Sequence, residues 1–595
     1  MSHRECEEGP RAPGVGLPVG GVMTGPWWSG RTWDDRCMHP NSVGENAPPL
    51  PEPALRSLSE HGVDAPRLRR VLALLSDGRP WDTNSLVRAG GVAHSLVSSL
   101  VEALSEEGEL VVEESDGPGR VRLARPADYA GAVFEDLADP VAHLVPRYAE
   151  ALAELERAVA GGPDSDLDLD HVTATAETAL RRALLLSTRF DLRDRTVLCV
   201  GDHDLTSVAL ALVCPRARAE VVDIDERVLS HVDSLAASLG LEVRTHFADL
   251  RLGLPHAVRG SADVVFTDPP YTPDGVELFV RRGVEGMVDP RRGRVLVAYG
   301  ASETTPRLAA AVQTRLVRMD LLMEAVWPDF NRYHGAESIG AVSDLYVLRP
   351  LSRTLPAPSG EVARVYSQGV NAKEARGGLD VGRAEAVLAR LAQEPVGDAE
   401  PTLVGEWPRQ VAEAGRVRLS TWMEAPVPVG DGCAVVNLTG GWERLAARAA
   451  LACPGETVYL LVPSSAACVR DETGQRALRA MVEPRFEVRF LRGFGSSDLT
   501  AVRLTRRAEP DSAVERLLVH VQERAHGRLT ATLRAGAVEV AAWRGNPINK
   551  RTARHAVAGV ASWVPEHTLL DLPEHRFGEL RAVVQGLVAG IPENV

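Results

Sequence analysis

Two acidic side chains flank a histidine at the end of a short apolar run. Val197–Val200 is followed by Gly201 and then by Asp202, His203 and Asp204. A glycine-rich loop at such a turn is typical of dinucleotide and S-adenosylmethionine sites, because glycine lets the backbone approach the ligand. Carboxylates at this place would repel a ligand carboxylate and stabilise a nearby ammonium or sulfonium group. The turn therefore favours a cationic ligand.

A simpler interpretation of the same turn stays open. A helix is expected to begin near Leu205, and aspartate oxygens at a helix start accept backbone N–H bonds. Such capping would account for one of the two aspartates. His203 titrates near neutral pH, so it is a proton acceptor when neutral, an obstacle to a dication when protonated, or an ordinary turn residue.

Acids also follow the next two expected strands. Asp223 comes directly after Ala219–Val222, about 20 residues beyond Gly201, which is the spacing of an acid that accepts ribose hydroxyls. Asp249 follows the expected strand Glu242–His246. We expect Asp249 either to accept the exocyclic amine of an adenine or to be a solvated surface residue.

Asp268, Pro269, Pro270 and Tyr271 follow the expected strand Ala262–Thr267. The paired prolines fix their φ angles, so the turn presents carbonyl groups and the Asp268 carboxylate toward one point. An amine bound there could donate hydrogen bonds to these oxygens while its lone pair faces an electrophile. Tyr271 could wall the pocket or make a cation–π contact. The motif predicts transfer onto an amine nitrogen without identifying the amine.

Strands and helices alternate through the region that carries these turns. This alternation over residues 191–352 predicts a doubly wound parallel sheet of the Rossmann-like, class I methyltransferase-like type, with its ligand beyond the carboxyl ends of the strands. The expected strands are Thr196–Val200, Ala219–Val222, Glu242–His246, Ala262–Thr267, Arg294–Ala298 and Asp344–Leu348.

Three units are expected before this sheet. Residues 1–52 are rich in glycine and proline and are predicted to be a disordered leader. Residues 53–127 have the element order of a winged-helix module, ending in a hairpin from Leu110 to Leu123, and residues 128–190 form a helical connector. The module's third helix, Ala93–Glu107, has acids and no Lys or Arg, which favours packing or dimerisation over DNA reading.

The C-terminal part is expected to hold a second α/β region without an evident sequence repeat. Residues 353–432 are predicted to be a linker with helices, and residues 511–595 a small α+β unit with a hairpin around Gly536. Between them, residues 433–510 alternate again, with expected strands at Ala434–Leu438, Thr457–Val462, Phe486–Phe490 and Thr500–Leu504.

The composition excludes several classes of function. The 595-residue chain has a formal net charge of −15, which opposes a broad phosphate-binding surface. Its seven cysteines have neither CxxC nor zinc spacing, so we expect reduced thiols, no metal and a cytoplasmic location. Lysine occurs only at Lys373 and Lys550, which argues against lysine chemistry. No stretch approaches the roughly 20 apolar residues of a membrane span.

Taken in order, the motifs resemble those of the branched-chain polyamine synthases, which are N(4)-bis(aminopropyl)spermidine synthases. The resemblance covers roughly residues 53–370 and includes the winged-helix order. Its motifs are Gly201–Ser207, Val222–Arg227, Ala248–Arg251 and Asp268–Thr272, together with the segments Thr173–Arg181 and Phe330–Leu348.

This resemblance implies an aminopropyl transfer. The co-substrate would be decarboxylated S-adenosylmethionine, with no prosthetic group; its aminopropyl group would move to a polyamine nitrogen and methylthioadenosine would leave. By the same resemblance Asp202 and Asp204 line the aminopropyl and amine pocket, Asp223 holds the ribose and Asp249 the adenine edge. Asp268 holds the acceptor amine, and it or Asp204 acts as the base or orienter.

His203 departs from the family's pattern, which has an acid at this position, so the choice of acceptor or donor stays open. Two other functions also stay open. One is an S-adenosylmethionine-dependent amino-methyltransferase on nucleic-acid bases, which also uses Asp-Pro-Pro-Tyr but needs a basic cleft. The other is a non-catalytic winged-helix regulator that senses a nucleoside or polyamine. We expect a polyamine partner, no nucleic acid or membrane, and allow for a homodimer.

Overall fold

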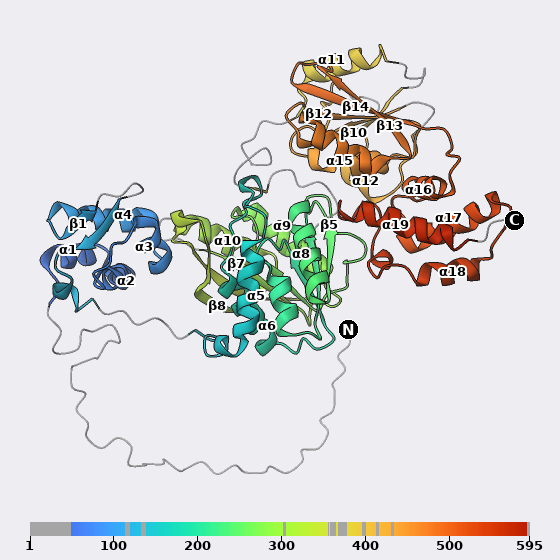
Figure 1. The fold of residues 1–595 in the computed structure, drawn as a ribbon. Coiled ribbons are helices and arrows are strands. Elements are labelled where there is room, and N and C mark those ends of the chain that lie inside the picture. The colour runs from blue at the N-terminus through green and yellow to red at the C-terminus, as the bar shows by residue number, and fades with distance from the viewer. Residues whose placement is uncertain are drawn as a thin grey trace, which may run out of the picture.

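The computed structural model describes residues 49–113, 119–132, 139–300, 305–354, 356, 365–366, 378–394, 400–411, 416–429 and 433–591 (Figure 1). The predicted leader falls almost entirely outside these residues, as do the turn of the N-terminal hairpin and parts of the predicted linker. In the described chain the strands form sheets of two, seven and five strands. None of the described helices is both long and apolar enough to cross a membrane.

The N-terminal module has the predicted order of helices followed by a hairpin. Its buried side chains, among them Leu72, Leu86, Val97 and Leu100, form a separate core. Its helices are α1 (Glu52–Glu60), α2 (Ala65–Leu75), α3 (Thr83–Gly90) and α4 (His94–Glu106), and its strands are β1 (Leu110–Glu113) and β2 (Arg120–Leu123). The assignment of this module as a winged helix, and the domain boundaries given above, stay predictions.

The seven-stranded sheet has the order β5-β4-β3-β6-β7-β9-β8. Its first five strands in this order are parallel, and β9 and β8 add an antiparallel hairpin. The predicted doubly wound sheet is thus confirmed, although β8 was not predicted. The strands are β3 (Thr196–Val200), β4 (Arg218–Asp223), β5 (Val243–Phe247), β6 (Val264–Thr267), β7 (Arg294–Tyr299), β8 (Leu321–Arg332) and β9 (Val342–Pro350).

Helices flank this sheet and bury their apolar faces against it. Helix α6 carries buried Leu180, Leu184 and Leu186 and packs against α7, and Thr175 caps its start by accepting from the Thr178 amide. Figure 1 shows α5, α6 and α8 together on one side of the molecule. The helices are α5 (Ala149–Ala160), α6 (Ala176–Arg189), α7 (Thr206–Val213), α8 (Glu226–Leu239), α9 (Pro273–Gly286) and α10 (Pro306–Arg318).

The five-stranded sheet has the order β10-β11-β12-β14-β13. Four of its strands lie where the sequence predicts them, whereas β10 falls in the segment predicted to be linker and helices. The strands are β10 (Thr402–Gly405), β11 (Ala434–Asn437), β12 (Thr457–Pro463), β13 (Phe486–Arg492) and β14 (Leu499–Arg506). Its helices are α11 (Val381–Leu391), α12 (Leu419–Glu424), α13 (Ala446–Leu451), α14 (Ala467–Arg470) and α15 (Glu472–Val482).

The described part of residues 511–595 is helical, so the predicted hairpin around Gly536 is wrong. Gly536 lies inside α17, and a Cβ atom there would be 2.4 Å from Leu517 Cδ1 on the neighbouring helix. The glycine therefore permits close helix packing and does not mark a turn. The helices are α16 (Ala513–Glu523), α17 (Leu529–Trp543), α18 (Lys550–Ala558) and α19 (Arg576–Ala589).

The C-terminal helices lie beside strand β5, and the N-terminal module lies at the β8 side of the sheet (Figure 1). Two contacts join the segment 567–571 to the β5 edge. The Phe247 amide donates to Asp571 O at 2.8 Å, and the side-chain Nε2 of His567 lies 2.8 Å from Thr245 O. Buried side chains of the two larger sheets and of the C-terminal helices belong to one core. The segment 567–571 thus covers an edge that would otherwise offer unpaired backbone groups.

Candidate active site

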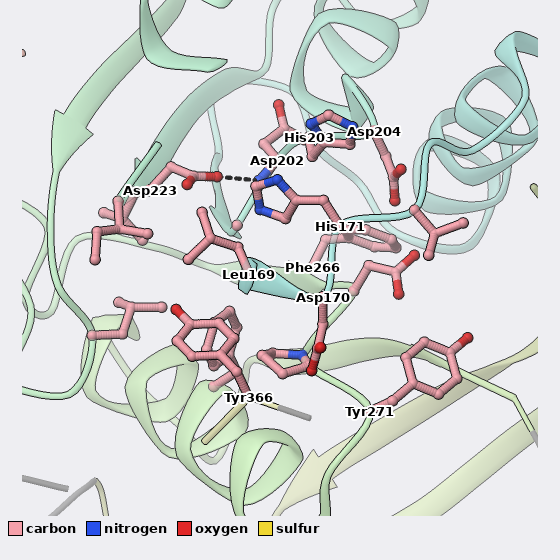
Figure 2. A pocket seen from close by; sticks show the side chains of 18 of the residues that line it. Leu169, Asp170, His171, Asp202, His203, Asp204, Asp223, Phe266, Tyr271 and Tyr366 are labelled. Atoms are coloured by element: carbon pink, nitrogen blue, oxygen red, sulfur yellow. Dashed lines mark hydrogen bonds between the residues drawn. The ribbon is translucent and has the colours of Figure 1, made fainter. Parts of the chain in front are cut away.

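The turns after β3 and β6 open onto one pocket, at the point where the strand order reverses. Figure 2 shows Asp202, His203, Asp204, Asp223 and Tyr271 around it. Its carboxyl groups come from Asp170, Asp202, Asp204, Asp223 and Asp268. No lysine or arginine is found among the described residues of this lining. The pocket surface is acidic, as the sequence predicts.

A buried arginine that the sequence did not reveal lies behind this surface. Arg182 of α6 is fully buried; its Nη1 donates to Asp204 Oδ2 at 2.8 Å and its Nη2 to Asp268 Oδ2 at 2.7 Å. Its Nε donates to Asn331 Oδ1 at 2.8 Å. The two turns are therefore joined through one guanidinium, whose single positive charge can neutralise one of the two central carboxylates.

The ionisation of Asp204 and that of Asp268 depend on each other. Burial raises the pKa of Asp268 to about 8, and the neighbouring Asp204 adds to this although Arg182 opposes it. Burial also disfavours ionisation of Asp204, but Arg182 and a hydrogen bond with Asp268 leave its pKa below the usual range. Tyr333 contributes a further bond, donating from its hydroxyl to Asp268 Oδ2 at 2.8 Å. Near neutral pH the pair thus shares one proton, held mainly on Asp268.

Asp202 serves the start of α7, as the capping interpretation predicts. Its carboxylate accepts the Ser207 amide at 3.2 Å and the Ser207 hydroxyl. The Asp202 amide donates to Asp223 Oδ2 at 3.1 Å, the bond drawn in Figure 2. Burial raises the pKa of Asp202 to about 7 and that of Asp223 to about 6. Both carboxyl groups line the pocket, but each already accepts backbone hydrogen bonds.

His203 stacks on a second histidine that the sequence did not single out. The rings of His171 and His203 have centroids 4.5 Å apart and planes inclined by 18° (Figure 2). His203 Nε2 lies 3.0 Å from Thr173 Oγ1, and its buried Nδ1 has no hydrogen-bond partner among the described residues. Burial lowers the pKa of His203, and the neighbouring His171 lowers it further, so the ring is neutral near pH 7. It therefore does not repel a cation.

Aromatic rings form the opposite wall. Tyr271 lines the pocket and its ring centroid is 5.4 Å from that of Tyr299. Tyr366, which lies beyond the sheet in the sequence, lines the pocket near Leu169 (Figure 2). Pro270 also lines it, whereas Pro269 does not. Gly201 has a φ of 75°, which favours glycine at the turn.

Asp249, like Pro269, is a predicted site residue that does not line this pocket. It lines a separate cavity on the side of the C-terminal region. Its Oδ1 accepts Arg251 Nε at 2.9 Å and its Oδ2 accepts Arg251 Nη2 at 2.6 Å. The predicted contact of Asp249 with an adenine is therefore not supported by its position; Ala248 and Leu250, its neighbours, line the pocket instead.

The strand order and the position of the pocket define a Rossmann-like α/β unit. Residues 150–353 match the family model for the C-terminal domain of branched-chain polyamine synthase A. The resemblance stated from the motifs is thus confirmed over these residues.

Known relatives match part of the chain. An uncharacterised protein of Methanocaldococcus jannaschii is 34% identical over 205 residues, covering 34% of this chain and 51% of that protein. N(4)-bis(aminopropyl)spermidine synthase of Thermococcus kodakarensis is 34% identical over 144 residues, covering 24% and 41%. The synthase of Thermus thermophilus is 33% identical over 219 residues, covering 36% and 62%. The chain thus spans about half the length of these relatives.

A solved structure also shows similarity. It is the branched-chain polyamine synthase of Thermus thermophilus in complex with N4-aminopropylspermidine and 5'-methylthioadenosine. The sequence identity is 22%, the TM-score is 0.38, and the match covers 52% of this chain and 96% of that one.

Proposed function

We propose that this protein is an aminopropyltransferase. It moves the aminopropyl group of decarboxylated S-adenosylmethionine onto a nitrogen of a spermidine-like polyamine, giving a branched product and methylthioadenosine. The observation that carries this proposal is the pocket lining at the switch point, with five aspartates and, among its described residues, no lysine or arginine. The names of two similar synthases support the same reaction.

The charge of the pocket selects the donor. Decarboxylated S-adenosylmethionine carries a sulfonium and an ammonium but no carboxylate, so nearby aspartates stabilise it. S-adenosylmethionine itself would bring a carboxylate to the turn at Asp202 and Asp204. We assign Asp223 to the ribose, because it is the last residue of β4, the strand that pairs with β3. We assign Gly201 to the close approach of the backbone to the donor.

The Asp204–Asp268 pair prepares the acceptor. A polyamine nitrogen must lose a proton before it can attack. Because the pKa of Asp268 is raised to about 8, the acceptor is the ionised fraction of Asp268, which grows as the pH approaches 8. The nitrogen lone pair then forms a C–N bond to the aminopropyl carbon while the C–S bond breaks. Sulfur keeps the electron pair, so methylthioadenosine leaves uncharged. Tyr271 and Pro270 wall the acceptor, and Pro269 shapes the turn.

Neutral His203 fits the same chemistry. Because burial keeps the pKa of His203 low, its unpartnered Nδ1 can accept a hydrogen bond from a bound cation without adding charge. Arg182 keeps Asp204 ionised, so the three groups carry no net charge when Asp268 is protonated and a net charge of −1 when Asp268 is ionised. Positioning in this enclosed acidic site would supply most of the acceleration.

The direct test is mass spectrometry of the full chain incubated with decarboxylated S-adenosylmethionine and a panel of linear polyamines. We expect a product heavier by one or two aminopropyl units, together with methylthioadenosine. Methyl transfer from S-adenosylmethionine to a nucleic-acid base, or ligand binding without turnover, would overturn the proposal in favour of a methyltransferase or a regulator.

Thermal unfolding gives an independent check of the donor's charge. A ligand that binds only the folded state raises its Tm, and at equal concentration a tighter ligand raises it more. Methylthioadenosine with spermidine should raise the Tm more than S-adenosylmethionine does at equal concentration, because only the latter brings a carboxylate to the acidic turn. Equal or reversed shifts would contradict the assignment.

A further inference from the structure

One wall of the proposed donor pocket is formed by the chain that follows β5. Ala248 and Leu250 line the pocket, while the residues that alternate with them, Asp249 and Arg251, are buried on the side of the C-terminal region. The Ala248 amide donates to Asp223 O at 2.8 Å, so this wall is tied directly to the residue assigned to the ribose. Any shift of the segment would move atoms that border the nucleoside.

Arg251 joins this wall to the five-stranded sheet. Its side chain is 2% exposed and pairs with Asp249 through Nε and Nη2. The same Nη2 donates to Gly441 O at 2.7 Å, and the guanidinium lies 3.9 Å from the centroid of the Trp442 ring. Two carboxylate contacts, a carbonyl contact and a cation–π contact thus converge on one planar group, which fixes it in position.

The partner loop is itself shaped for this contact. Gly440 and Gly441 follow β11 with φ angles of 85° and 95°, which favour glycine, and Trp442 is 3% exposed. The loop leaves the carboxyl end of β11 and turns its backbone carbonyl to the donor wall of the other sheet. The loop therefore joins the five-stranded sheet directly to the residues of the donor wall.

We propose that Arg251 is a positioning residue for the nucleoside end of the donor and that the Gly440–Trp442 loop, which holds Arg251, supports the donor site from outside the pocket. This inference rests on the proposed function. Arg251 acts through Ala248 and Leu250, which border the nucleoside, and not through contact with the reacting atoms. The five-stranded sheet is then required for donor affinity, although the residues assigned to the chemistry all lie in the other sheet.

The test uses the full chain and the affinity for 5'-methylthioadenosine measured by calorimetry. Trp442→Leu removes the stacking partner without touching the donor wall, and Arg251→Gln removes the link itself. Each should raise the Kd for methylthioadenosine about tenfold, the equivalent of one lost contact of ordinary strength. The Kd for spermidine, measured alone, should change less than about twofold, because the acceptor turn lies on β6.

A matched control separates positioning from loss of a buried arginine. Arg485 is 1% exposed in the same C-terminal region and donates to the carbonyl oxygens of Leu451 and Gln522. Arg485→Gln should lower the Tm but leave the Kd for methylthioadenosine unchanged. The double variant Asp249→Asn with Arg251→Gln removes the unpaired buried charge, so it should regain Tm without regaining affinity.

The outcomes are distinct from those that test the proposed function. If the unmodified chain does not bind methylthioadenosine, the proposed function fails. If it binds while folded Trp442→Leu and Arg251→Gln variants keep the same Kd, this inference is overturned and the function stands. Equal weakening by Arg485→Gln would also overturn it, because the effect would then be a general loss of stability.

Discussion

The two larger sheets share one strand topology but differ in the residues at their strand ends. The order β3-β6-β7-β9-β8 has two parallel pairs and then two antiparallel pairs, and β10-β11-β12-β14-β13 repeats this sequence of pairings. The seven-stranded sheet adds β4 and β5 at the free side of β3. A common scaffold thus occurs twice, once with the strand that carries Asp223 and once without it.

The side chains that follow corresponding strand ends differ in chemistry: they are acidic in one sheet and aromatic in the other. In each sheet the first shared strand leads to a glycine with positive φ, Gly201 at 75° and Gly405 at 88°. Gly201 is followed by buried Asp202, whereas Gly405 is followed by exposed Glu406 and then by Trp407, which is 2% exposed. The Trp407 ring donates its Nε1 hydrogen to Val404 O at 3.0 Å. Buried acids follow the strand end at the proposed donor turn. A buried tryptophan, which packs in the core, follows the corresponding strand end of the other sheet.

The largest expected difference between the regions concerns their buried arginines. Arg182→Met leaves Asp204 and Asp268 without a counter-charge, which should cost about 3–5 kcal/mol of unfolding free energy and abolish turnover. Arg485→Met removes a guanidinium that donates to backbone carbonyls, so it should cost less and spare turnover. Urea denaturation with an activity assay measures both. Equal losses of unfolding free energy and of activity in the two variants would show that the Asp204–Arg182–Asp268 network contributes no more than Arg485 does.

The next prediction compares one acid from each sheet. Asp268→Asn keeps the shape of the turn but removes the proposed proton acceptor, so kcat should fall by about 10²–10⁴-fold while methylthioadenosine still binds. Glu406→Gln, at an exposed strand end of the other sheet, should leave kcat unchanged. Steady-state kinetics with binding calorimetry provide the measurement, and an unchanged kcat for Asp268→Asn would exclude Asp268 as the acceptor.

Per pH unit, the smallest expected effect is a pH dependence of stability that originates in the acidic pocket. Burial raises the pKa of Asp268 to about 8 and that of Asp202 to about 7, whereas unfolding returns both to about 4. Between these values the folded state holds more protons than the unfolded state, so stability falls as pH rises from about 5 to 8. One such group contributes at most about 1.4 kcal/mol per pH unit. Asp268→Asn should flatten the slope of unfolding free energy against pH; an unchanged slope would assign it to other groups.

The strands of the parallel sheets could be predicted because they are short apolar runs that end at turns. Strand β8 was missed because it is an edge strand with mixed exposure and contains Pro328 and Asp329. Strand β10 was missed because it has only four residues, Thr402–Gly405. The Gly536 hairpin was wrong because glycine was taken as a turn former, although here it allows two helices to approach.

Part of the site could be predicted because carboxyl ends of parallel strands meet at one edge of a sheet, which brings Asp204, Asp223 and Asp268 together. Arg182 and Tyr333 could not be predicted, since α6 and the β8–β9 hairpin reach the pocket only through tertiary packing. A signal existed for Arg182: it occupies a position on the apolar face of an amphipathic helix, where an arginine requires a buried partner. Asp249 was misplaced because its partner, Arg251, is fixed by a loop from the other sheet.

The cover over strand β5 limits how copies of this chain could associate. Because segment 567–571 already bonds to Thr245 and Phe247, a second molecule cannot extend the sheet from that side. A symmetric dimer that extended the seven-stranded sheet would therefore have to use its opposite rim, at β8. Truncation before His567 would uncover the strand, and the shortened chain would be prone to self-association into disordered aggregates.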